Sequence, residues 1–303
     1  MNKTALLFAG QGSQYIGMGR DIYDSDENIR KLYKIASDIL GYDVAALCFT
    51  NNDLLNLTKY TQPAIMITSY CLYYYLCSKI KIKPQVMAGF SLGEYTALCA
   101  AEVLDFPTAL QLVNFRAHAM DKAASKSDGA MAAIIGYAQD KLEIICKEIG
   151  DVIIANYNCP NQLVVSGKRK AVESVCDLAK EQGAKRIVML NVSGAFHSPL
   201  MTAAADEISE YLIGMEFKKP VVDIIMNCTA EPLNYKILPK LITKQITSSV
   251  YFEDTIRKMI DDYHIERFIE IGPGKVLSGF VKRINSDKKV ISINKINDWQ
   301  ILK

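Results

Sequence analysis

The segment Gly89-Phe90-Ser91-Leu92-Gly93 carries the residue pattern of an activated serine nucleophile. The residues before it predict a strand and those after it predict a helix, which is the context in which G-x-S-x-G has chemical meaning. The glycines allow a sharp turn that lifts the serine hydroxyl out of the sheet. The N–H of Leu92, at the helix start, can then face a developing oxyanion. An ordinary helix-capping serine in a glycine-rich turn is the alternative.

A serine nucleophile needs a general base within hydrogen-bond reach. His197 is the strongest of the three histidines, because it lies on a loop or helix start, where catalytic groups are often carried. His118 falls on a predicted helix, and His264 lies among acidic residues of an expected surface turn. No acid stands out as a third member of a triad. A Ser–His pair with its imidazole held by a main-chain carbonyl is at least as plausible.

Arg116 lies on or beside the apolar stripe of a helix that we expect over residues 106–124. Burying a guanidinium there is costly unless the group is paired. A structural ion pair with an internal carboxylate would explain why Arg116 is buried. A bidentate clamp for a substrate carboxylate would also explain it. Glu94 could be the partner of Arg116 under either hypothesis, so the sequence does not separate them.

Composition excludes several classes of function. The chain has 303 residues, of which 50% are hydrophobic, enough for one large core or two unequal domains. With 35 basic and 33 acidic residues the net charge is +2, so no strong field points to nucleic acid. No apolar run approaches the roughly 20 residues that a membrane span needs. The short apolar N-terminal run predicts a buried first strand rather than a signal peptide.

Cysteine and histidine usage adds two further expectations. The eight cysteines form no C-x-x-C pair and lie mostly in apolar segments, which favours free thiols and a cytoplasmic location. The three histidines are too few for a zinc site built on several histidines. We therefore expect no metal site.

The elements that must position these residues alternate between short apolar runs and helical patterns, which favours a mostly parallel α/β sheet. Pro63 is expected in the first turn of its helix, where a missing N–H costs little. The expected strands cover residues 4–9 and 85–88, and the expected helices cover residues 62–78, 94–101 and 106–124.

The middle of the chain has a different pattern, in the order βαββαβ, which is typical of a ferredoxin-like unit. Its expected strands cover residues 131–136, 152–156, 163–166 and 185–190, and its expected helices cover residues 140–149 and 168–182. Asn158 falls in the connection between the second and third strands. We therefore predict a large α/β domain of residues 1–127 and 193–303 with an inserted ferredoxin-like subdomain of residues 128–192.

Seven segments together carry a resemblance to a known family. They are FAGQGSQ (8–14), TQPA (61–64), GFSLGEY (89–95), FR (115–116), QLVVSG (162–167), GAFHS (194–198) and GPGK (272–275). In this order the chain resembles malonyl-CoA:acyl carrier protein transacylases and the related acyltransferase domains of fatty-acid and polyketide synthases. The resemblance covers essentially the whole chain and implies a hydrolase-like large domain with a ferredoxin-like insertion.

The resemblance implies a role for each reacting group. Ser91 would be the acylated nucleophile and His197 its base, as a dyad. The N–H groups of Gln11 and Leu92 would form the oxyanion hole. Arg116 would hold the free carboxylate of a malonyl group.

The expected substrate-binding set is completed by Gln62, Phe196, Gln245 and Asn158. The ring of Phe196 would crowd a 2-methyl group, a clash of one methylene that discriminates by about 1–3 kcal/mol. Position 90 departs from the family, since many members have a histidine beside the serine. This change leaves the core chemistry intact.

The implied function is transfer of malonyl from malonyl-coenzyme A to the phosphopantetheine thiol of acyl carrier protein in fatty-acid biosynthesis. The mechanism would be ping-pong through a malonyl-serine, with no cofactor, no nucleic acid, no membrane and a monomeric enzyme. An acyltransferase of a polyketide pathway, a serine hydrolase of acyl thioesters and an inactive docking domain stay open. The acidic carrier protein could meet the basic clusters at 168–170, 218–219 or 288–289, each of which is also explained as solvated surface charge.

Overall fold

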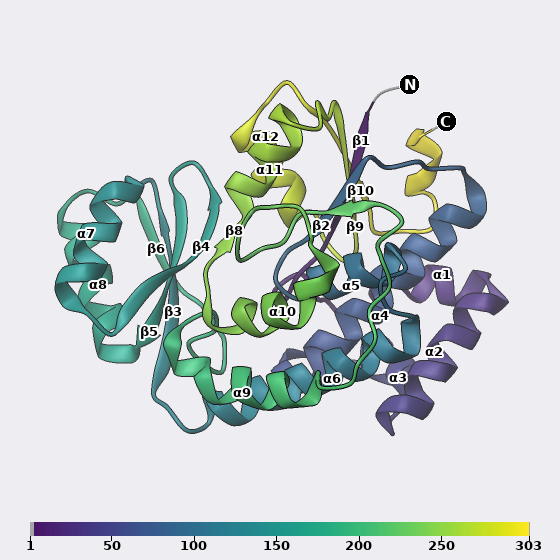
Figure 1. Cartoon of the computed structure of the whole chain (residues 1–303), viewed down its shortest axis with the longest axis horizontal. Helices are drawn as coiled ribbons and strands as arrows, with labels where there is room; N and C mark the ends of the chain where they lie inside the picture. Colours follow the sequence, from purple (N-terminus) through teal and green to yellow (C-terminus); the bar gives the residue numbers. More distant parts are fainter. Residues whose placement is uncertain (1–2, 303) are drawn as a thin grey trace.

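Five parallel strands form the central sheet of the larger part of the molecule (Figure 1). The computed structural model describes residues 3–302. The strand order is β10-β9-β1-β2-β7, with bounds β1 Thr4–Phe8, β2 Val86–Gly89, β7 Asp223–Ile224, β9 Arg267–Ile271 and β10 Lys289–Ile293. All residues of β1 and β2 are buried, as expected for strands of a parallel sheet covered on both faces. The predicted mostly parallel α/β fold is confirmed.

Helices cover both faces of this sheet. Leu6 and Phe8 of β1 pack towards α1–α6, α9 and α10, whereas the alternate residues Ala5 and Leu7 pack towards α11 and α12. The helix bounds are α1 Arg20–Ser25, α2 Glu27–Leu40, α3 Val44–Phe49, α4 Thr58–Lys79, α5 Gly93–Ala100, α6 Phe106–Ala124, α9 Thr202–Tyr211, α10 Leu238–Thr247, α11 Phe252–Asp261 and α12 Val276–Ile284. Short 3-10 turns are η1 Leu54–Asn56, η2 Pro199–Met201, η3 Tyr235–Ile237 and η4 Asp298–Leu302. Among residues 3–302, no helix combines the length and apolar content of a bilayer span.

A second sheet is built mainly from the middle of the chain, in the order β6-β3-β5-β4-β8. Its strands are β3 Gly129–Ile135, β4 Val152–Cys159, β5 Gln162–Lys168, β6 Arg186–Met189 and β8 Val250–Tyr251. The first four pair antiparallel with one another, and their order is that of the predicted ferredoxin-like pattern. The fifth strand was not predicted. β8 pairs parallel to β4, so a segment nearly one hundred residues away completes this sheet.

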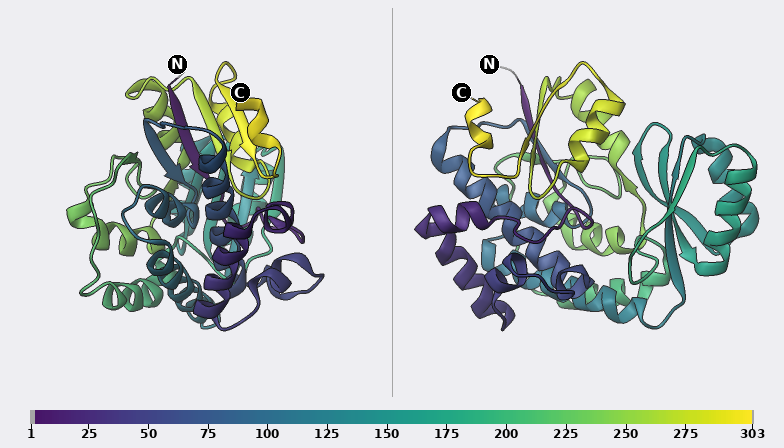
Figure 2. Two further views of the ribbon diagram at one scale, coloured as in Figure 1. Left: turned by 90° about the vertical axis from the view of Figure 1, so that its right-hand side faces the viewer. Right: turned by 180° about the vertical axis from the view of Figure 1, so that it is seen from behind.

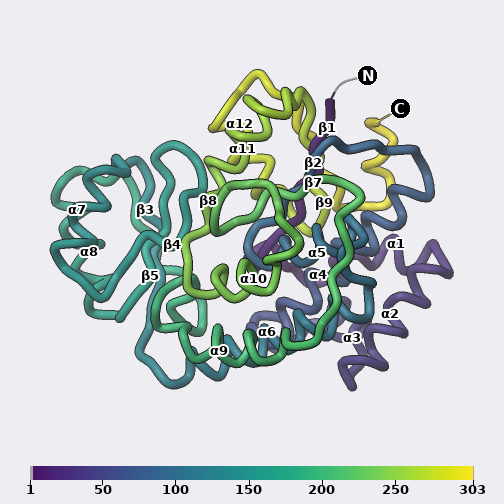
Figure 3. The backbone as a smooth tube through the Cα atoms, in the orientation of Figure 1, coloured from purple at the N-terminus to yellow at the C-terminus, as the bar shows by residue number. Residues whose placement is uncertain are grey.

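The helices α7 Gln139–Ile149 and α8 Arg169–Glu181 cover one face of the second sheet. Figures 1 and 2 place both helices on the outer side, away from the first sheet. The inner face carries Met131, Ala133 and Val164, which belong to the same apolar cluster as the helices around the first sheet. Figure 3 shows the backbone passing from α6 into the second sheet and returning towards α9. The two sheets therefore face each other across a shared interior.

Two local predictions were wrong. Helix α4 begins at Thr58 rather than at residue 62, so Pro63 lies inside the helix and not in its first turn. Proline at that position removes the usual helical donor for the Lys59 carbonyl. Asn158 lies within β4, not in a connection, because β4 continues to Cys159 through two irregularities in its pairing with β5.

The first sheet presents the carboxyl ends of β1, β2 and β9 at one edge. The loop that begins at Ala9 follows β1, Phe90 and Ser91 follow β2, and Gly272 follows β9. Sites in parallel α/β sheets form outside these carboxyl ends, so this edge is where a functional site is expected.

Candidate active site

Ser91 occupies a tight turn between β2 and α5, with a φ of +50°, a conformation that non-glycine residues rarely adopt. The flanking glycines are required by close packing. A Cβ on Gly89 would lie 1.8 Å from the carbonyl carbon of Gly93, and a Cβ on Gly93 would lie 2.1 Å from the Phe8 carbonyl oxygen. The sequence G-x-S-x-G therefore folds into a strained turn that lifts the Ser91 side chain out of the sheet edge.

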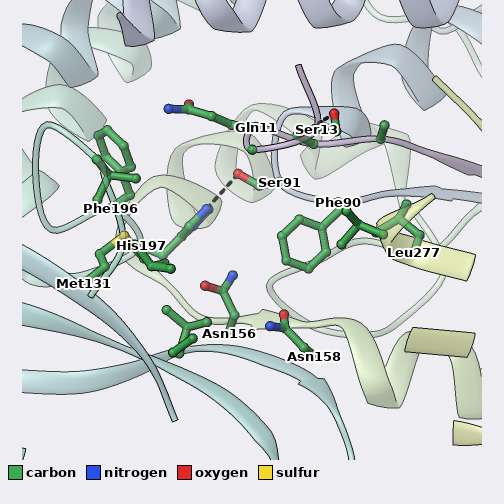
Figure 4. A pocket seen from close by; sticks show the side chains of 18 of the residues that line it. Gln11, Ser13, Phe90, Ser91, Met131, Asn156, Asn158, Phe196, His197 and Leu277 are labelled. Atoms are coloured by element: carbon green, nitrogen blue, oxygen red, sulfur yellow. Dashed lines mark hydrogen bonds between the residues drawn. The ribbon is translucent and has the colours of Figure 1, made fainter. Parts of the chain in front are cut away.

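The hydroxyl of Ser91 meets the imidazole of His197, with 2.7 Å between Oγ and Nε2 (Figure 4). The two residues are 106 positions apart in the chain. His197 is buried, has a φ of +58° and lies just before η2. Its Nδ1 is 2.9 Å from the main-chain carbonyl oxygen of Gln245. A carbonyl can only accept, so Nδ1 carries the proton and Nε2 is free to accept the serine proton.

The arrangement is a serine–histidine pair whose imidazole is oriented by a carbonyl, one of the two possibilities that the sequence left open. Burial, and to a smaller extent the positive charge of Arg116, together lower the pKa of His197 from its usual value to about 4. The imidazole is therefore neutral at pH 7, which is the protonation state that a general base needs.

Arg116 is buried behind the serine and makes three polar contacts. Nη1 donates to Gln62 Oε1 at 2.6 Å, while Nη2 donates to Ser91 Oγ at 3.1 Å and to Gln245 Oε1 at 3.2 Å. The guanidinium also lies over the ring of Tyr95, 5.1 Å from its centre. Within residues 3–302 it forms no ion pair, and its Nε has no acceptor. The structural ion pair is therefore absent, and the guanidinium keeps donor capacity beside the serine.

Glu94 accepts hydrogen bonds from amide groups and forms no ion pair with Arg116. Its carboxylate accepts from the Asn227 N–H at 2.6 Å and from Gln245 Nε2 at 2.8 Å. Burial raises the pKa of Glu94 to about 7, against the opposing effect of these hydrogen bonds and of the Arg116 charge. Gln245 Nε2 also donates to the Ser91 carbonyl oxygen at 3.1 Å. Gln245 thus contacts Glu94, Arg116, Ser91 and His197.

Two backbone amides near the serine are unoccupied. The N–H groups of Gln11 and Leu92 donate to no acceptor within residues 3–302. Leu92 directly precedes α5, where the helix terminus adds partial positive charge. Gln11 lies on the loop after β1, above Ser91 in the view of Figure 4, and its side chain bonds to Thr58 and Gln62. Such free amides can stabilise an oxyanion on an attacked carbonyl.

A cavity of about 460 Å³ opens onto Ser91 and His197 between the two sheets. Its volume is in the range of small-molecule sites. Its residues are Ala9, Gly10, Gln11, Gly12, Ser13, Gln14, Asn56, Gln62, Phe90, Ser91, Met120, Met131, Ala133, Asn156, Asn158, Gln162, Val164, Leu190, Asn191, Val192, Phe196, His197, Glu270, Val276, Leu277 and Phe280. Of the nine residues predicted for the site, three lie outside this lining: Arg116 and Gln245 hydrogen-bond to Ser91, and Leu92 follows Ser91 in the chain.

The cavity has walls of different character, as Figure 4 shows for its labelled residues. Asn156 and Asn158, both from β4, give one wall its amides, and Phe90 and Leu277 give another wall its apolar surface. The Oδ1 of Asn158 is buried without a hydrogen-bond partner in the described part of the chain. Asn158 therefore has an acceptor available for a donor in the cavity.

Asn227 is a buried polar residue of this region that the sequence analysis did not single out. Its Oδ1 accepts from the Ser91 N–H at 2.6 Å, and its Nδ2 donates to the Gly89 carbonyl oxygen at 2.7 Å. The signal in the sequence was an asparagine within an apolar run, Ile224-Ile225-Met226-Asn227-Cys228. An amide is buried in such a run only when it is hydrogen-bonded.

The chemistry that this arrangement can perform is acyl transfer through a serine ester. A neutral base faces the hydroxyl, two amides are free for an oxyanion, and a cation lies within reach of an acyl group on the serine. The described residues hold no group of three or more histidine, cysteine, aspartate or glutamate side chains arranged to bind a metal ion.

Comparisons with known proteins agree with this chemistry. The profile of the acyl transferase domain family matches residues 5–296. A relative from Bacillus subtilis (strain 168), named malonyl CoA-acyl carrier protein transacylase, is 42% identical, and the match covers 97% of this chain and 94% of the relative. The solved structure of MCAT from Streptococcus pneumoniae is 40% identical with a TM-score of 0.94, covering 99% of both chains.

A third similar protein is a malonyl-transacylase solved in complex with its type II PKS acyl-carrier protein. It is 35% identical with a TM-score of 0.95, and the match covers 98% of both chains. The family profile, the relatives and the solved structures all match this chain over almost its whole length. The chain belongs to the acyl transferase domain family.

Proposed function

We propose that the chain transfers a malonyl group from malonyl-coenzyme A to the phosphopantetheine thiol of acyl carrier protein. The observation that carries the proposal is the buried Arg116, which has no carboxylate partner in the described residues and lies 3.1 Å from Ser91 Oγ. A guanidinium in this position suits an acyl group that has a free carboxylate. Relatives at 42% and 38% identity, both named malonyl CoA-acyl carrier protein transacylase, support the same substrate pair.

In the first half-reaction His197 Nε2 takes the Ser91 proton as Oγ attacks the thioester carbon. The N–H groups of Leu92 and Gln11 hold the oxyanion, a contribution of about 3 kcal/mol for one such donor in other enzymes. The C–S bond then breaks, and His197 returns the proton to the coenzyme A sulfur. A malonyl-serine ester is left, with its carboxylate held by Arg116.

The second half-reaction reverses these steps with a different thiol. His197 takes the proton of the pantetheine thiol as sulfur attacks the ester carbon. The C–Oγ bond breaks, and the proton passes from His197 back to Ser91. One thioester is consumed and one is formed, so the chemistry needs no redox group, and we propose that it needs no cofactor.

The remaining predicted site residues support the substrate. Gln62 and Gln245 hold the Arg116 guanidinium through their Oε1 atoms. Phe196 lines the cavity and would crowd a 2-methyl branch, which favours malonyl over methylmalonyl. Asn158 offers its unpartnered Oδ1 to an N–H donor, such as a pantetheine amide.

We also propose the division into a large domain of residues 1–127 and 193–303 and a small subdomain of residues 128–192. The change in sheet between β2 and β3 supports it, although β8 from the large domain completes the second sheet. Eight free cysteines, seven of them buried, fit action in the cytoplasm. The proposed working unit is a monomer that uses neither nucleic acid nor a membrane.

The proposed setting is fatty-acid biosynthesis. A free-standing acyltransferase of a polyketide pathway is the second candidate, because a similar solved protein is held in complex with a type II PKS acyl-carrier protein. The two settings use the same chemistry at Ser91. Transfer rates with carrier proteins from both kinds of pathway decide between them.

A serine hydrolase of acyl thioesters would share Ser91 and His197 but has no need of Arg116. The test is a reaction with malonyl-coenzyme A with and without the carrier protein. A transferase forms malonyl carrier protein and releases little free malonate. Release of malonate at the same rate without a thiol acceptor would favour the hydrolase.

A further inference from the structure

Asn227 lies between β7 and β8 and directs all four of its polar groups to other segments. Its side chain bridges the Ser91 N–H and the Gly89 carbonyl oxygen. Its main-chain N–H donates to Glu94 Oε2 at 2.6 Å, and its carbonyl accepts from the Tyr251 N–H at 2.9 Å. Asn227 is completely buried, so none of these bonds competes with water.

We propose that Asn227 is a positioning residue that sets the reactive conformation of Ser91, an inference that rests on the proposed function. Ser91 holds a φ of +50°, a strained conformation that persists only where the surrounding structure enforces it. The amide of Asn227 spans the turn, because it binds the residue two positions before the serine as well as the serine itself. This bridge fixes the peptide groups on both sides of Phe90.

The same contacts tie the serine to the rest of the site. Through its main chain, Asn227 meets Glu94, which also binds Gln245, the residue whose carbonyl orients His197. Through its carbonyl it meets Tyr251 of β8, which pairs with β4 in the second sheet. Asn227 therefore holds the nucleophile in register with both the base and the second sheet.

The test uses the substitution Asn227→Asp, which keeps the size of the side chain. An ionised carboxylate accepts from the Ser91 N–H but cannot donate to the Gly89 carbonyl oxygen, 2.7 Å from the present Nδ2. A protonated carboxyl can form both bonds. The charged or titratable groups around this position are Glu94 and Tyr95 on α5, Arg116 on α6, His197 before η2, Lys244 on α10 and the neighbouring Cys228. The wild type and the variant both contain these groups. The ratio of their rates at each pH therefore reports the effect of the new carboxyl alone.

We expect the full-length variant to lose about 100-fold in kcat at pH 8, the effect of misplacing a reacting atom by about 1 Å, with little change in KM for malonyl-coenzyme A. The loss should shrink as the pH is lowered to about 5.5, because full burial beside the Glu94 carboxylate raises the pKa of the new carboxyl, and its protonation then restores the bridge. A fluorophosphonate probe, which reacts with the activated serine and needs neither coenzyme A nor carrier protein, should label Ser91 more slowly in the variant at pH 8 and recover over the same range.

The matched control is Thr255→Val. Thr255 is equally buried and its Oγ1 donates to the Tyr251 carbonyl oxygen at 2.8 Å, but it forms no hydrogen bond with Ser91. The Thr255→Val substitution should lower Tm but leave the rate of probe labelling at Ser91 at the wild-type value.

The inference is overturned if Asn227→Asp labels at the wild-type rate, if its loss is the same at both pH values, or if Thr255→Val slows labelling equally. Wild-type protein that takes the probe but no malonyl would instead reject the proposed function, and the labelling comparison would still decide on Asn227.

Discussion

At the scale of single residues, the protonation of His197 follows from its burial. Its pKa of about 4 lies below the ordinary value because an imidazolium would be desolvated and would face the Arg116 cation. The base is active when neutral, so activity is present above this pKa and lost as the pH falls through it. We expect kcat/KM for malonyl-coenzyme A to stay near its plateau down to about pH 5.5.

The control for this pH profile is Arg116→Ala, assayed with acetyl-coenzyme A because acetyl does not need the clamp. Removing the guanidinium removes a cause of the low pKa of His197, so the acid limb should move to higher pH. A wild-type profile that falls to half near pH 6.5 would contradict the neutral, desolvated base.

The second prediction at this scale concerns acyl choice. Arg116→Ala should lower malonyl transfer about 10- to 100-fold, as expected for losing a charge-assisted pair of about 1–3 kcal/mol. Acetyl transfer should fall less, because an acetyl group leaves the guanidinium unpaired. Competition between the two coenzyme A thioesters, read by mass spectrometry of the carrier protein, measures the ratio.

Lys122→Ala is the matched control for this substitution. Lys122 lies on the same helix, α6, but pairs with Glu207 at the surface. Its removal should leave the acyl ratio at the wild-type value. Equal losses for malonyl and acetyl in Arg116→Ala would count against a carboxylate clamp.

At the scale of elements, the turn between β2 and α5 depends on contact between backbones. A Cβ on Gly93 would lie 2.1 Å from the Phe8 carbonyl oxygen of β1, and backbone cannot move aside as a flexible side chain does. Gly93→Ala should therefore lower the free energy of unfolding by at least about 3 kcal/mol. Urea unfolding followed by circular dichroism measures it.

Gly279→Ala is the opposite case and serves as its control. Gly279 lies on the exposed side of α12 with nothing within 4 Å of an added Cβ. The same substitution there should stabilise the protein by about 1 kcal/mol through helix propensity alone. Similar destabilisation at both glycines would show that the close approach at Gly93 is not what matters.

The strand, turn and helix around Ser91 could be predicted because glycine spacing and apolar runs are local signals, and the expected helix at 106–124 is observed with the same bounds. The pairing of β8 with β4 could not be predicted, because a strand of two residues has no periodicity and its partner is far away in sequence.

The same reasoning separates the site residues. Ser91 and His197 could be selected by residue type, because few groups activate a hydroxyl and the chain has only three histidines. The Gln245 contacts could not be predicted from the sequence. Its main-chain carbonyl accepts from His197 and its side chain donates to the Ser91 carbonyl, and no sequence pattern indicates either bond. Arg116 could be placed in the interior, but whether a carboxylate met it depended on tertiary structure.

At the scale of the whole molecule, the site exists only where the two sheets meet. Ser91 comes from the edge of the first sheet, and His197 from the segment that returns from the second. Gln245, which orients the imidazole, precedes β8, the strand that joins the second sheet. The cavity takes residues from both sheets, so chain segments throughout the sequence contribute to one pocket.

The most direct test of a malonyl-serine intermediate is the intact mass of the protein after brief incubation with malonyl-coenzyme A alone. The wild type should gain one malonyl group on Ser91, and added acyl carrier protein should remove it and appear malonylated, whereas Ser91→Ala should gain nothing. An unmodified wild type that still malonylates the carrier protein, or an adduct that persists in Ser91→Ala, would contradict the account.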